Sequence, residues 1–221
     1  MTAAETRDQH DVATINLVGG ALCLDLANTV EGREGPDRRE ALHGPMDLVV
    51  WSRRAGILSD QEADQLARQV EADPSVAGQA MARVVELREA LYRVFTTIVR
   101  QRSPAESDLD IVQRTLAEGL RHARLEPAVG DAIGRFEWRW VDGGEPSIDL
   151  IRWLAAASAV DLVRFGRLDR LRQCPGGGEE PCNWLFLDTT RGGNRRWCSM
   201  SDCGSRFKWR RQNAKRRAPR R

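Results

Sequence analysis

The chain has 221 residues, of which 41% are hydrophobic and 30% charged, and a formal net charge of +2, which excludes a disordered or fibrous protein. No apolar run approaches the roughly 18 residues that a membrane span needs, and residues 1–11 lack the apolar core of a secretion signal. We therefore expect a cytoplasmic protein with no membrane partner, whose reduced thiols make disulfides the weaker interpretation of its cysteines.

Helices dominate the prediction for the first part of the chain. Apolar side chains recur through residues 17–30, and the polar, breaker-rich stretch that follows them predicts a loop. A short helix is expected over residues 46–55, where Gly56 stops it. Ser59 then begins another helix, because Glu62 stands at the capping-box position three residues later.

The longest periodic segment begins at Pro74 and is expected to end at Ser103, with apolar residues repeating at spacings of three and four. That period indicates an amphipathic helix packed on a core. We predict a further helix over residues 106–122, and a strand over residues 135–141 with a hairpin partner just upstream. A last body helix follows and ends at Gly166.

Together these segments predict a mainly α fold. Its N-terminal body, residues 14–167, is helical and carries one small β-hairpin. A cysteine-rich module, residues 168–217, follows without a flexible linker and ends in a basic helix. We therefore expect the module to pack directly on the last body helix.

Four of the five cysteines form two pairs, Cys174-x7-Cys182 and Cys198-x4-Cys203. Zinc takes four ligands in a tetrahedron, and each ligand pair usually sits on a tight turn. Glycine and proline fill the first gap, and the segment between the pairs is strand-like, then turn-like, then extended. This order predicts a module of the treble-clef or zinc-ribbon kind that holds one structural Zn²⁺.

Reactive or buried free thiols and redox disulfides are the competing interpretations of these four cysteines. A module of about fifty residues with few aliphatic side chains cannot easily build its own core, which favours a metal. A shell of four thiolates leaves no open position for water or substrate, so this zinc is not expected to be catalytic. Cys23 stands alone on an apolar helix and is interpreted as a core thiol.

The segment WLFLDTTRGGNRRWCSMSDCGSRFKWRRQNAKRR resembles the CGNR zinc finger family. Upstream, GALCLDLANT and DLVVWSRRAGIL are similar to the helical ABATE domain that precedes this finger. The chain departs from the family pattern in two ways, because Ser205 replaces the Asn of the signature and the first cysteine pair is more widely spaced. The resemblance implies a DNA-binding transcription regulator of the bacterial type, some members being linked to stress responses.

The charge of the chain is unevenly distributed. Residues 191–221 hold twelve basic residues and one acidic residue, a net charge of +11, and the other 190 residues carry −9. An acidic body with a basic tail is typical of proteins that bind a polyanion, although a tail that only aids solubility has the same composition. We expect contacts with double-stranded DNA. The candidate residues are Arg195, Arg196, Ser205, Arg206, Lys208, Arg210, Arg211, Lys215, Arg216 and Arg217.

The tryptophans of the module have separate interpretations. Trp184 and Trp197 are assigned to its small core. Trp209 lies off the buried face of the basic helix, and we expect it to cover the body rather than to stack on a base. RNA stays open as the nucleic acid, although the sequence has no obvious stacking platform.

Asp25, Asn28 and Thr29 are polar residues on an otherwise apolar helix, and with Trp51 they are candidates for the lining of a ligand pocket. The alternative, which we favour, is a structural role in a buried polar network. None of the three histidines stands in a catalytic constellation, and nucleotide-binding fingerprints are missing from the sequence. We therefore do not expect an enzyme.

Two classes of binding function remain from the sequence. The first is a zinc-dependent, nucleoid-associated DNA-binding regulator whose body senses a small-molecule effector or forms a homodimer. The second is an adaptor that binds nucleic acid or RNA polymerase without sequence preference. Selectivity for sequence separates the two.

Overall fold

The computed structural model describes residues 11–36, 38–127, 136–140, 146–178 and 181–217. The helices, in chain order, are α1 (Leu22–Ala27), α2 (Pro45–Arg54), α3 (Asp60–Ala72), α4 (Pro74–Val99), α5 (Glu106–Gly119), α6 (Ile148–Phe165) and α7 (Ser205–Arg217). Short antiparallel hairpins pair β1 (Val30–Glu31) with β2 (Arg39–Glu40), β3 (Ala123–Pro127) with β4 (Phe136–Trp140), and β5 (Leu171–Gln173) with β6 (Leu185–Leu187). Within these ranges, no helix combines the length and the apolar character that a bilayer crossing requires.

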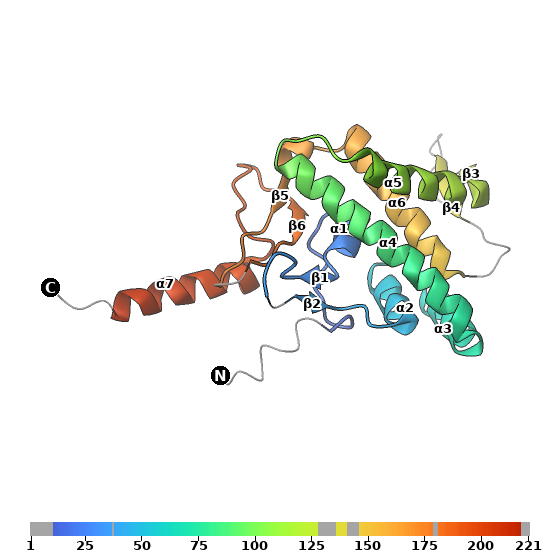
Figure 1. Cartoon of the computed structure of the whole chain (residues 1–221), viewed down its shortest axis with the longest axis horizontal. Coiled ribbons are helices and arrows are strands. Elements are labelled where there is room, and N and C mark those ends of the chain that lie inside the picture. The colour runs from blue at the N-terminus through green and yellow to red at the C-terminus, as the bar shows by residue number, and fades with distance from the viewer. Residues whose placement is uncertain (1–10, 37, 128–135, 141–145, 179–180, 218–221) are drawn as a thin grey trace.

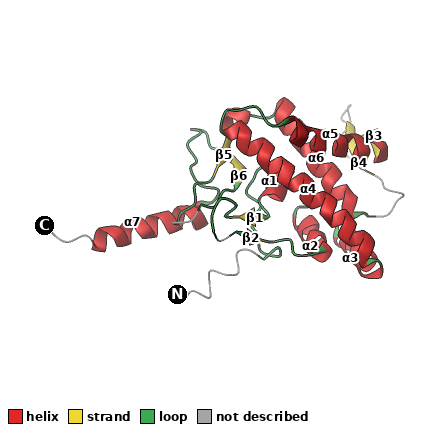
Figure 2. Ribbon diagram, in the orientation of Figure 1, coloured by secondary structure: helices red, strands yellow, loops and turns green. Residues whose placement is uncertain are grey.

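The mainly α prediction is confirmed, and Figure 2 shows how small the strands are beside the helices. The structure has three hairpins in its described parts, of which β3–β4 was predicted. In the module, the sequence predicted that residues 184–188 pair with residues 195–198, but β6 pairs with the upstream strand β5 instead. The hairpin β1–β2 was not predicted and follows α1 directly. The helix that the sequence predicted after Gly19 and Gly20 is present, but α1 ends at Ala27 rather than at Val30, because residues 28–31 turn into this hairpin.

α4 is the central helix of the body and contacts α1, α2, α3, α5 and α6 (Figure 1). It begins at Pro74, and the side chain of Asp73 accepts a hydrogen bond (3.0 Å) from the N–H of Val76. The helix ends before the predicted Ser103. Gln101 adopts a φ of 55°, and the N–H of Arg102 reaches back to the carbonyl of Thr97 (3.0 Å), which is a Schellman-type ending.

The capping box predicted at the start of α3 is present. Ser59 Oγ accepts from the N–H of Glu62 (3.3 Å), and Glu62 Oε2 accepts from the N–H of Ser59 (2.8 Å). The hydrogen bonds from Ser59 lower the pKa of Glu62. The two capping-box hydrogen bonds each satisfy a backbone N–H that has no partner within the helix.

The hairpin β3–β4 has one apolar face, and much of that face meets solvent. Leu125 pairs with Trp138 across the strands, and their exposed fractions are 57% and 51%. Phe136 at the far end is 60% exposed. The near end is tighter, because Trp140 lies close to the backbone of Gly119, where a Cβ atom would meet its ring at 2.9 Å.

The body and the cysteine module share one hydrophobic core. All four module cysteines, Trp184 and the β6 residues Leu185 and Phe186 belong to the same buried cluster as the leucines of α1 and α4. The module packs directly on the body, as predicted, but β5 and β6 lie against α4 and β6 against α1. We expected the last body helix, α6, as the main partner.

Asn28 at the end of α1 joins the body to β6. Its Nδ2 donates to the carbonyl of Leu185 and its Oδ1 accepts from the N–H of Leu185, both at 2.8 Å and both buried. The N–H of Leu187 in the same strand donates to the carbonyl of Gly19 (2.9 Å). The body therefore takes the place of a neighbouring strand along this edge of β6.

Replacement of Asn28 with Ala should lower the free energy of unfolding by about 2–4 kcal/mol, because two buried backbone groups of Leu185 lose their partners. Urea unfolding of the zinc-loaded protein measures this loss. The exposed Asn16 provides the control, and its replacement with Ala should change stability by less than about 0.5 kcal/mol. Equal stability of the two variants would contradict the role assigned to Asn28.

Candidate zinc centre and basic helix

The four module cysteines converge on one point. Their Sγ atoms all lie within 4.8 Å of one another, and all four side chains are buried. The Sγ atoms of Cys182 and Cys198 are 3.8 Å apart, as are those of Cys198 and Cys203. Zn–S bonds of about 2.3 Å in a tetrahedron separate the sulfur atoms by about 3.8 Å. The cluster therefore fits a single structural zinc ion.

The first ligand pair lies on a tight loop between β5 and β6. Cys174 follows β5, and its N–H donates to the carbonyl of Trp184 (2.8 Å), while the N–H of Asn183 donates to the carbonyl of Cys174 (3.1 Å). Asn183 takes the left-handed conformation, with a φ of 64°, at the turn next to Cys182. These bonds hold the two thiols on the same side of the hairpin.

The second ligand pair lies where the chain turns into α7. Cys198 is in a loop, and Cys203 is in the turn formed by residues 200–204. The two ligand loops touch at Gly177, where a Cβ atom would lie 1.9 Å from the carbonyl oxygen of Cys203. Only glycine allows this approach at position 177, and the neighbouring Gly176 has a φ of 80°, which also favours glycine.

The four thiols interact strongly with one another. Hydrogen bonds from Cys182, Cys198 and Cys203 lower the pKa of Cys174, whereas hydrogen bonds within the cluster and burial raise the pKa values of Cys182 and Cys198. Nη2 of Arg206 lies 3.3 Å from Cys203 Sγ and donates to it. Thiolates are the zinc ligands, and the four of them complete the coordination shell, so the ion has a structural role.

The ABATE family, described as "putative stress-induced transcription regulator", matches residues 20–166. The CGNR zinc finger matches residues 170–216, which include all four zinc ligands. The chain belongs to the ABATE family. No curated protein matches the chain. In this ABATE protein the finger follows the helical domain, in the order that the sequence resemblance implied.

Arg206, one of the candidates for contacting DNA, makes contacts that the sequence did not predict. Its guanidinium lies between the finger and the body. It pairs with Asp202 (3.0 Å) and with Glu31 of β1 (3.4 Å). The second oxygen of Glu31 pairs with Arg39 of β2 (3.1 Å). Arg206 therefore fixes the first turn of α7 to the β1–β2 hairpin, and 38% of its side chain stays exposed.

Arg195 also serves the finger itself. Its Nε donates to the carbonyl of Trp197 (3.0 Å), its Nη2 donates to the carbonyl of Cys198, and its guanidinium lies 4.5 Å from the centre of the Phe186 ring. The structure has loop rather than the predicted extended strand at this point. Arg196 remains exposed and lies over the rings of Trp197 and Phe207.

Ser205, at the position of the signature Asn, makes a turn contact. Its Oγ donates to the carbonyl of Met200 (2.9 Å). Further along α7, Lys208, Arg211 and Arg216 are exposed, and Arg210 is half-buried. Lys215 and Arg217 belong to the same helix, but their side chains lie outside the described part of the structure.

The module tryptophans divide as the sequence suggested, with one exception. Trp184 is buried, and Trp197 packs against Phe207 with their ring centres 5.2 Å apart. Trp209 does not cover the body, since 65% of it is exposed. It lines a groove between α7 and the loop at Gly177 and Gly178.

The residues proposed for a ligand pocket have structural contacts instead. The side-chain amide of Asn28 hydrogen-bonds to the backbone N–H and carbonyl of Leu185. Thr29 Oγ1 donates to the carbonyl of Leu26 (2.8 Å) and lies 3.1 Å from Nη1 of the buried Arg88, and Trp51 is fully buried. These contacts agree with the structural alternative that the sequence analysis favoured.

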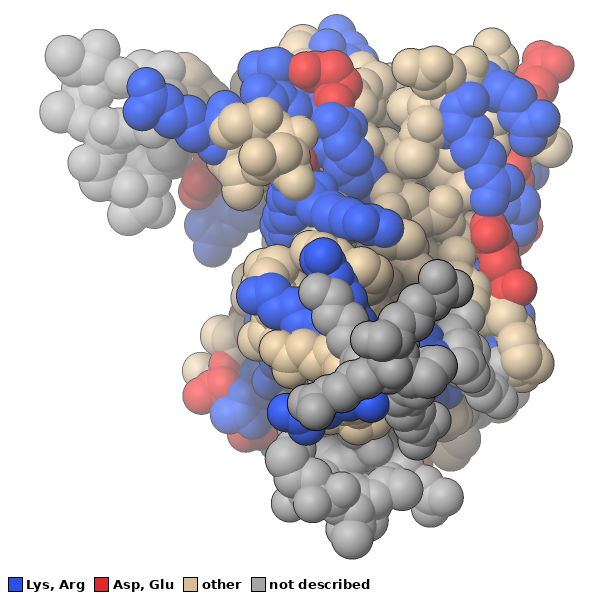
Figure 3. All heavy atoms as spheres, turned by 90° about the vertical axis from the view of Figure 1, so that its left-hand side faces the viewer, with Lys and Arg blue, Asp and Glu red and all other residues tan. Residues whose placement is uncertain are grey.

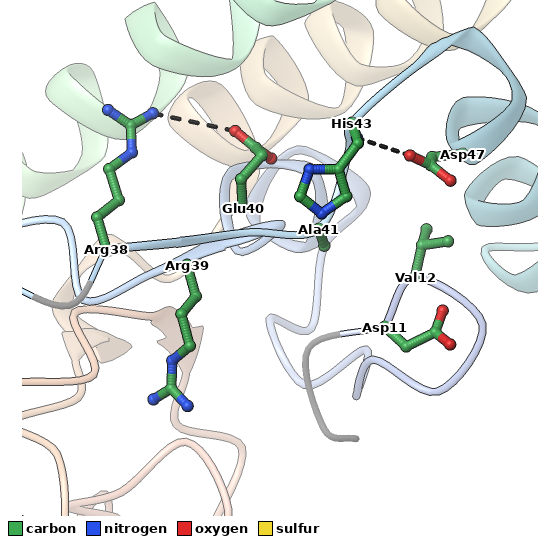
Figure 4. A pocket seen from close by; sticks show the side chains of 8 residues that line it. All are labelled: Asp11, Val12, Arg38, Arg39, Glu40, Ala41, His43 and Asp47. Atoms are coloured by element: carbon green, nitrogen blue, oxygen red, sulfur yellow. Dashed lines mark hydrogen bonds and ion pairs between the residues drawn. The ribbon is translucent and has the colours of Figure 1, made fainter. Parts of the chain in front are cut away.

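A pocket of about 540 Å³ lies elsewhere, beside β2 (Figure 4). Its lining residues are Asp11, Val12, Arg38, Arg39, Glu40, Ala41, His43 and Asp47. Two of its carboxylates already have strong partners. Glu40 accepts from both terminal nitrogens of Arg88 (2.7 and 2.8 Å), and Asp47 accepts from the N–H groups of His43 (2.6 Å) and Gly44 (3.0 Å). This pocket could not be predicted from the sequence, because its residues come from separate polar segments without a motif.

Replacement of Cys198 with Ser should release zinc and unfold the module, because three thiolates do not complete the shell. The rate of hydrogen exchange should rise across residues 171–206, while α4 to α6 stay protected. It should also rise near Gly32, because its N–H donates to the carbonyl of Cys182 (3.0 Å). Replacement of the buried Cys23 with Ala is the control and should leave zinc content unchanged. Stoichiometric zinc in the Cys198 variant would refute the ligand assignment.

Asp25 should make stability depend on pH. Burial raises its pKa to about 6, although the N–H of Gly19 donates to its carboxylate (2.8 Å) and lowers that pKa. A raised pKa means that the stabilising contribution of the protonated form is complete below pH about 4 and is lost as the pH rises through 6. Replacement of Asp25 with Asn removes this loss, which is on the order of 2 kcal/mol.

Urea unfolding of both proteins from pH 4 to pH 7 tests this prediction. Zinc release at acid pH affects the two proteins alike, so the difference between their unfolding free energies reports on Asp25 alone. Parallel profiles over this range would show that the Asp25 carboxyl has no raised pKa in the folded protein.

Proposed function

We propose that this ABATE protein is a zinc-dependent, DNA-binding transcription regulator in which α7 contacts duplex DNA. One observation supports this most strongly. α7 begins at the zinc turn and extends away from the rest of the molecule (Figure 1), and Lys208, Arg211 and Arg216 on it are exposed. Like charges on a short helix repel one another unless a polyanion neutralises them, and DNA is such a partner.

The surface around α7 supports the same proposal. Figure 3 looks onto the end of the molecule from which α7 projects, and Lys and Arg side chains occupy much of the centre of this face. The body carries most of the acidic residues, since residues 191–221 have a net charge of +11 and the others −9. A charge division of this kind orients a protein toward a polyanion before contact. Binding to chromosomal DNA also implies a place in the nucleoid.

The helical body is proposed to sense a small-molecule effector or to form a homodimer. Two contacts support a regulatory connection. Arg206 joins Glu31 of the body to α7, the proposed DNA-binding element, and Asn28 joins the body to β6 of the zinc module. The role is binding rather than catalysis, in keeping with a zinc ion whose four protein ligands leave no position for a substrate.

A second candidate function is an adaptor that holds nucleic acid without sequence preference. The basic charge of the tail supports it, since phosphate contacts carry no sequence information. Selection of the zinc-loaded protein on a random duplex library, at salt near physiological, distinguishes the two. An enriched motif supports the regulator, and a palindromic motif also supports a dimer. Binding without enrichment that fades evenly with salt would favour the adaptor.

Combined replacement of Lys208, Arg211 and Arg216 with Ala should weaken duplex binding by more than tenfold at physiological salt. Each lost phosphate contact should also reduce the slope of log K against log salt by about 0.9. The control removes the same charge from the body by replacing the exposed Arg68, Arg102 and Arg114 with Ala. Fluorescence anisotropy with a labelled duplex measures both quantities. An equal loss in the two variants would mean that α7 is not the DNA-binding element.

A further inference from the structure

The outward face of α7 consists of residues spaced three or four apart. These are Ser205, Lys208, Trp209, Gln212 and Arg216, and all five are exposed. This spacing places their side chains along one side of the helix. The opposite side carries Phe207, which packs on Trp197 beside the zinc site. The five residues are therefore the ones that a helix docked through its free side presents to a partner.

The middle of this face is uncharged. Binding to phosphates through charge alone gives no reason for uncharged side chains at these positions. Trp209 and Gln212 lie there, between Lys208 and Arg216. The indole of Trp209 is 65% exposed, and the groove of about 690 Å³ between α7 and the Gly177–Gly178 loop leaves space beside it. An aromatic side chain held in solvent on a basic helix gains apolar contact when the helix docks.

The major groove of duplex DNA offers a partner for each of the two uncharged side chains. Thymine presents its C5-methyl group, which accepts apolar contact, and adenine presents N7 and N6, which a glutamine amide matches with two hydrogen bonds. Three residues of α-helix rise about 4.5 Å, and adjacent base pairs are about 3.4 Å apart. Trp209 and Gln212 are therefore spaced to meet the same or neighbouring base pairs.

We propose that Trp209 and Gln212 read A·T base pairs in the major groove, with Trp209 against the thymine methyl group and Gln212 on adenine. Lys208 and Arg216 contact the phosphates on either side. This inference rests on the proposed function, because it requires α7 to be the element that enters DNA. Beyond the proposed function, the inference assigns the sequence preference to two uncharged side chains, Trp209 and Gln212.

Chemical changes to the bases of the selected duplex test the two contacts separately. Replacement of thymine with deoxyuridine removes only the methyl group, and should weaken binding of the unaltered protein about threefold to fivefold at one position. Replacement of adenine with 7-deazaadenine removes the N7 acceptor and should weaken binding about tenfold. The Trp209→Ala variant should lose the sensitivity to deoxyuridine, and the Gln212→Ala variant the sensitivity to 7-deazaadenine.

The Lys208→Ala and Arg216→Ala variants are the matched controls on the same face of α7. They should weaken binding to every duplex equally and retain both base sensitivities, and zinc content confirms that each variant keeps the folded module. Unchanged sensitivity to deoxyuridine in Trp209→Ala, or to 7-deazaadenine in Gln212→Ala, overturns the inference while the proposed function stands. An unaltered protein that enriches no sequence overturns the sequence-specific regulator as well.

Discussion

Four thiols buried within 4.8 Å of one another set the constraint on which the finger depends. Four thiolates at this distance would repel one another in a medium that solvates charge poorly, and a zinc ion at their centre removes that repulsion. Zinc binding supplies the energy to close the loop of the first cysteine pair against the turn of the second. The position of Gly177 against the carbonyl of Cys203 follows from that closure, as does the point at which α7 begins.

The zinc module is joined to the helical body at several independent points. Asn28 pairs with both backbone groups of Leu185, and Arg206 is held by Glu31. Because these contacts lie next to the ligand loops, they fix the direction in which α7 leaves the molecule. The ABATE domain and the finger are therefore in direct contact at the point where α7 begins.

The sequence predicted the features that depend on residues close together in the chain. Cysteine spacing was enough to find the zinc ligands, and the Ser59 and Glu62 pair marked the start of α3 because a capping box spans only four residues. The sequence did not predict side-chain contacts that depend on the tertiary fold or on the conformation of a loop. Nothing in the sequence distinguishes Arg206 from its basic neighbours, and its partner Glu31 is far away in the chain. Arg195 binds two carbonyls of its own loop, which the sequence predicted as an extended strand. The period that marks an apolar helix also extended α1 too far, since it continues into the β1 strand.

In the proposed function, zinc places α7 so that it can bind DNA. The most direct measurement returns zinc in steps to metal-free protein and follows its affinity for duplex DNA at physiological salt. We expect affinity to rise with added zinc and to level off at one ion per chain. Equal affinity in the metal-free and zinc-loaded protein would rule out this role of zinc, because the basic residues would then bind DNA without the structure that the four cysteines hold together.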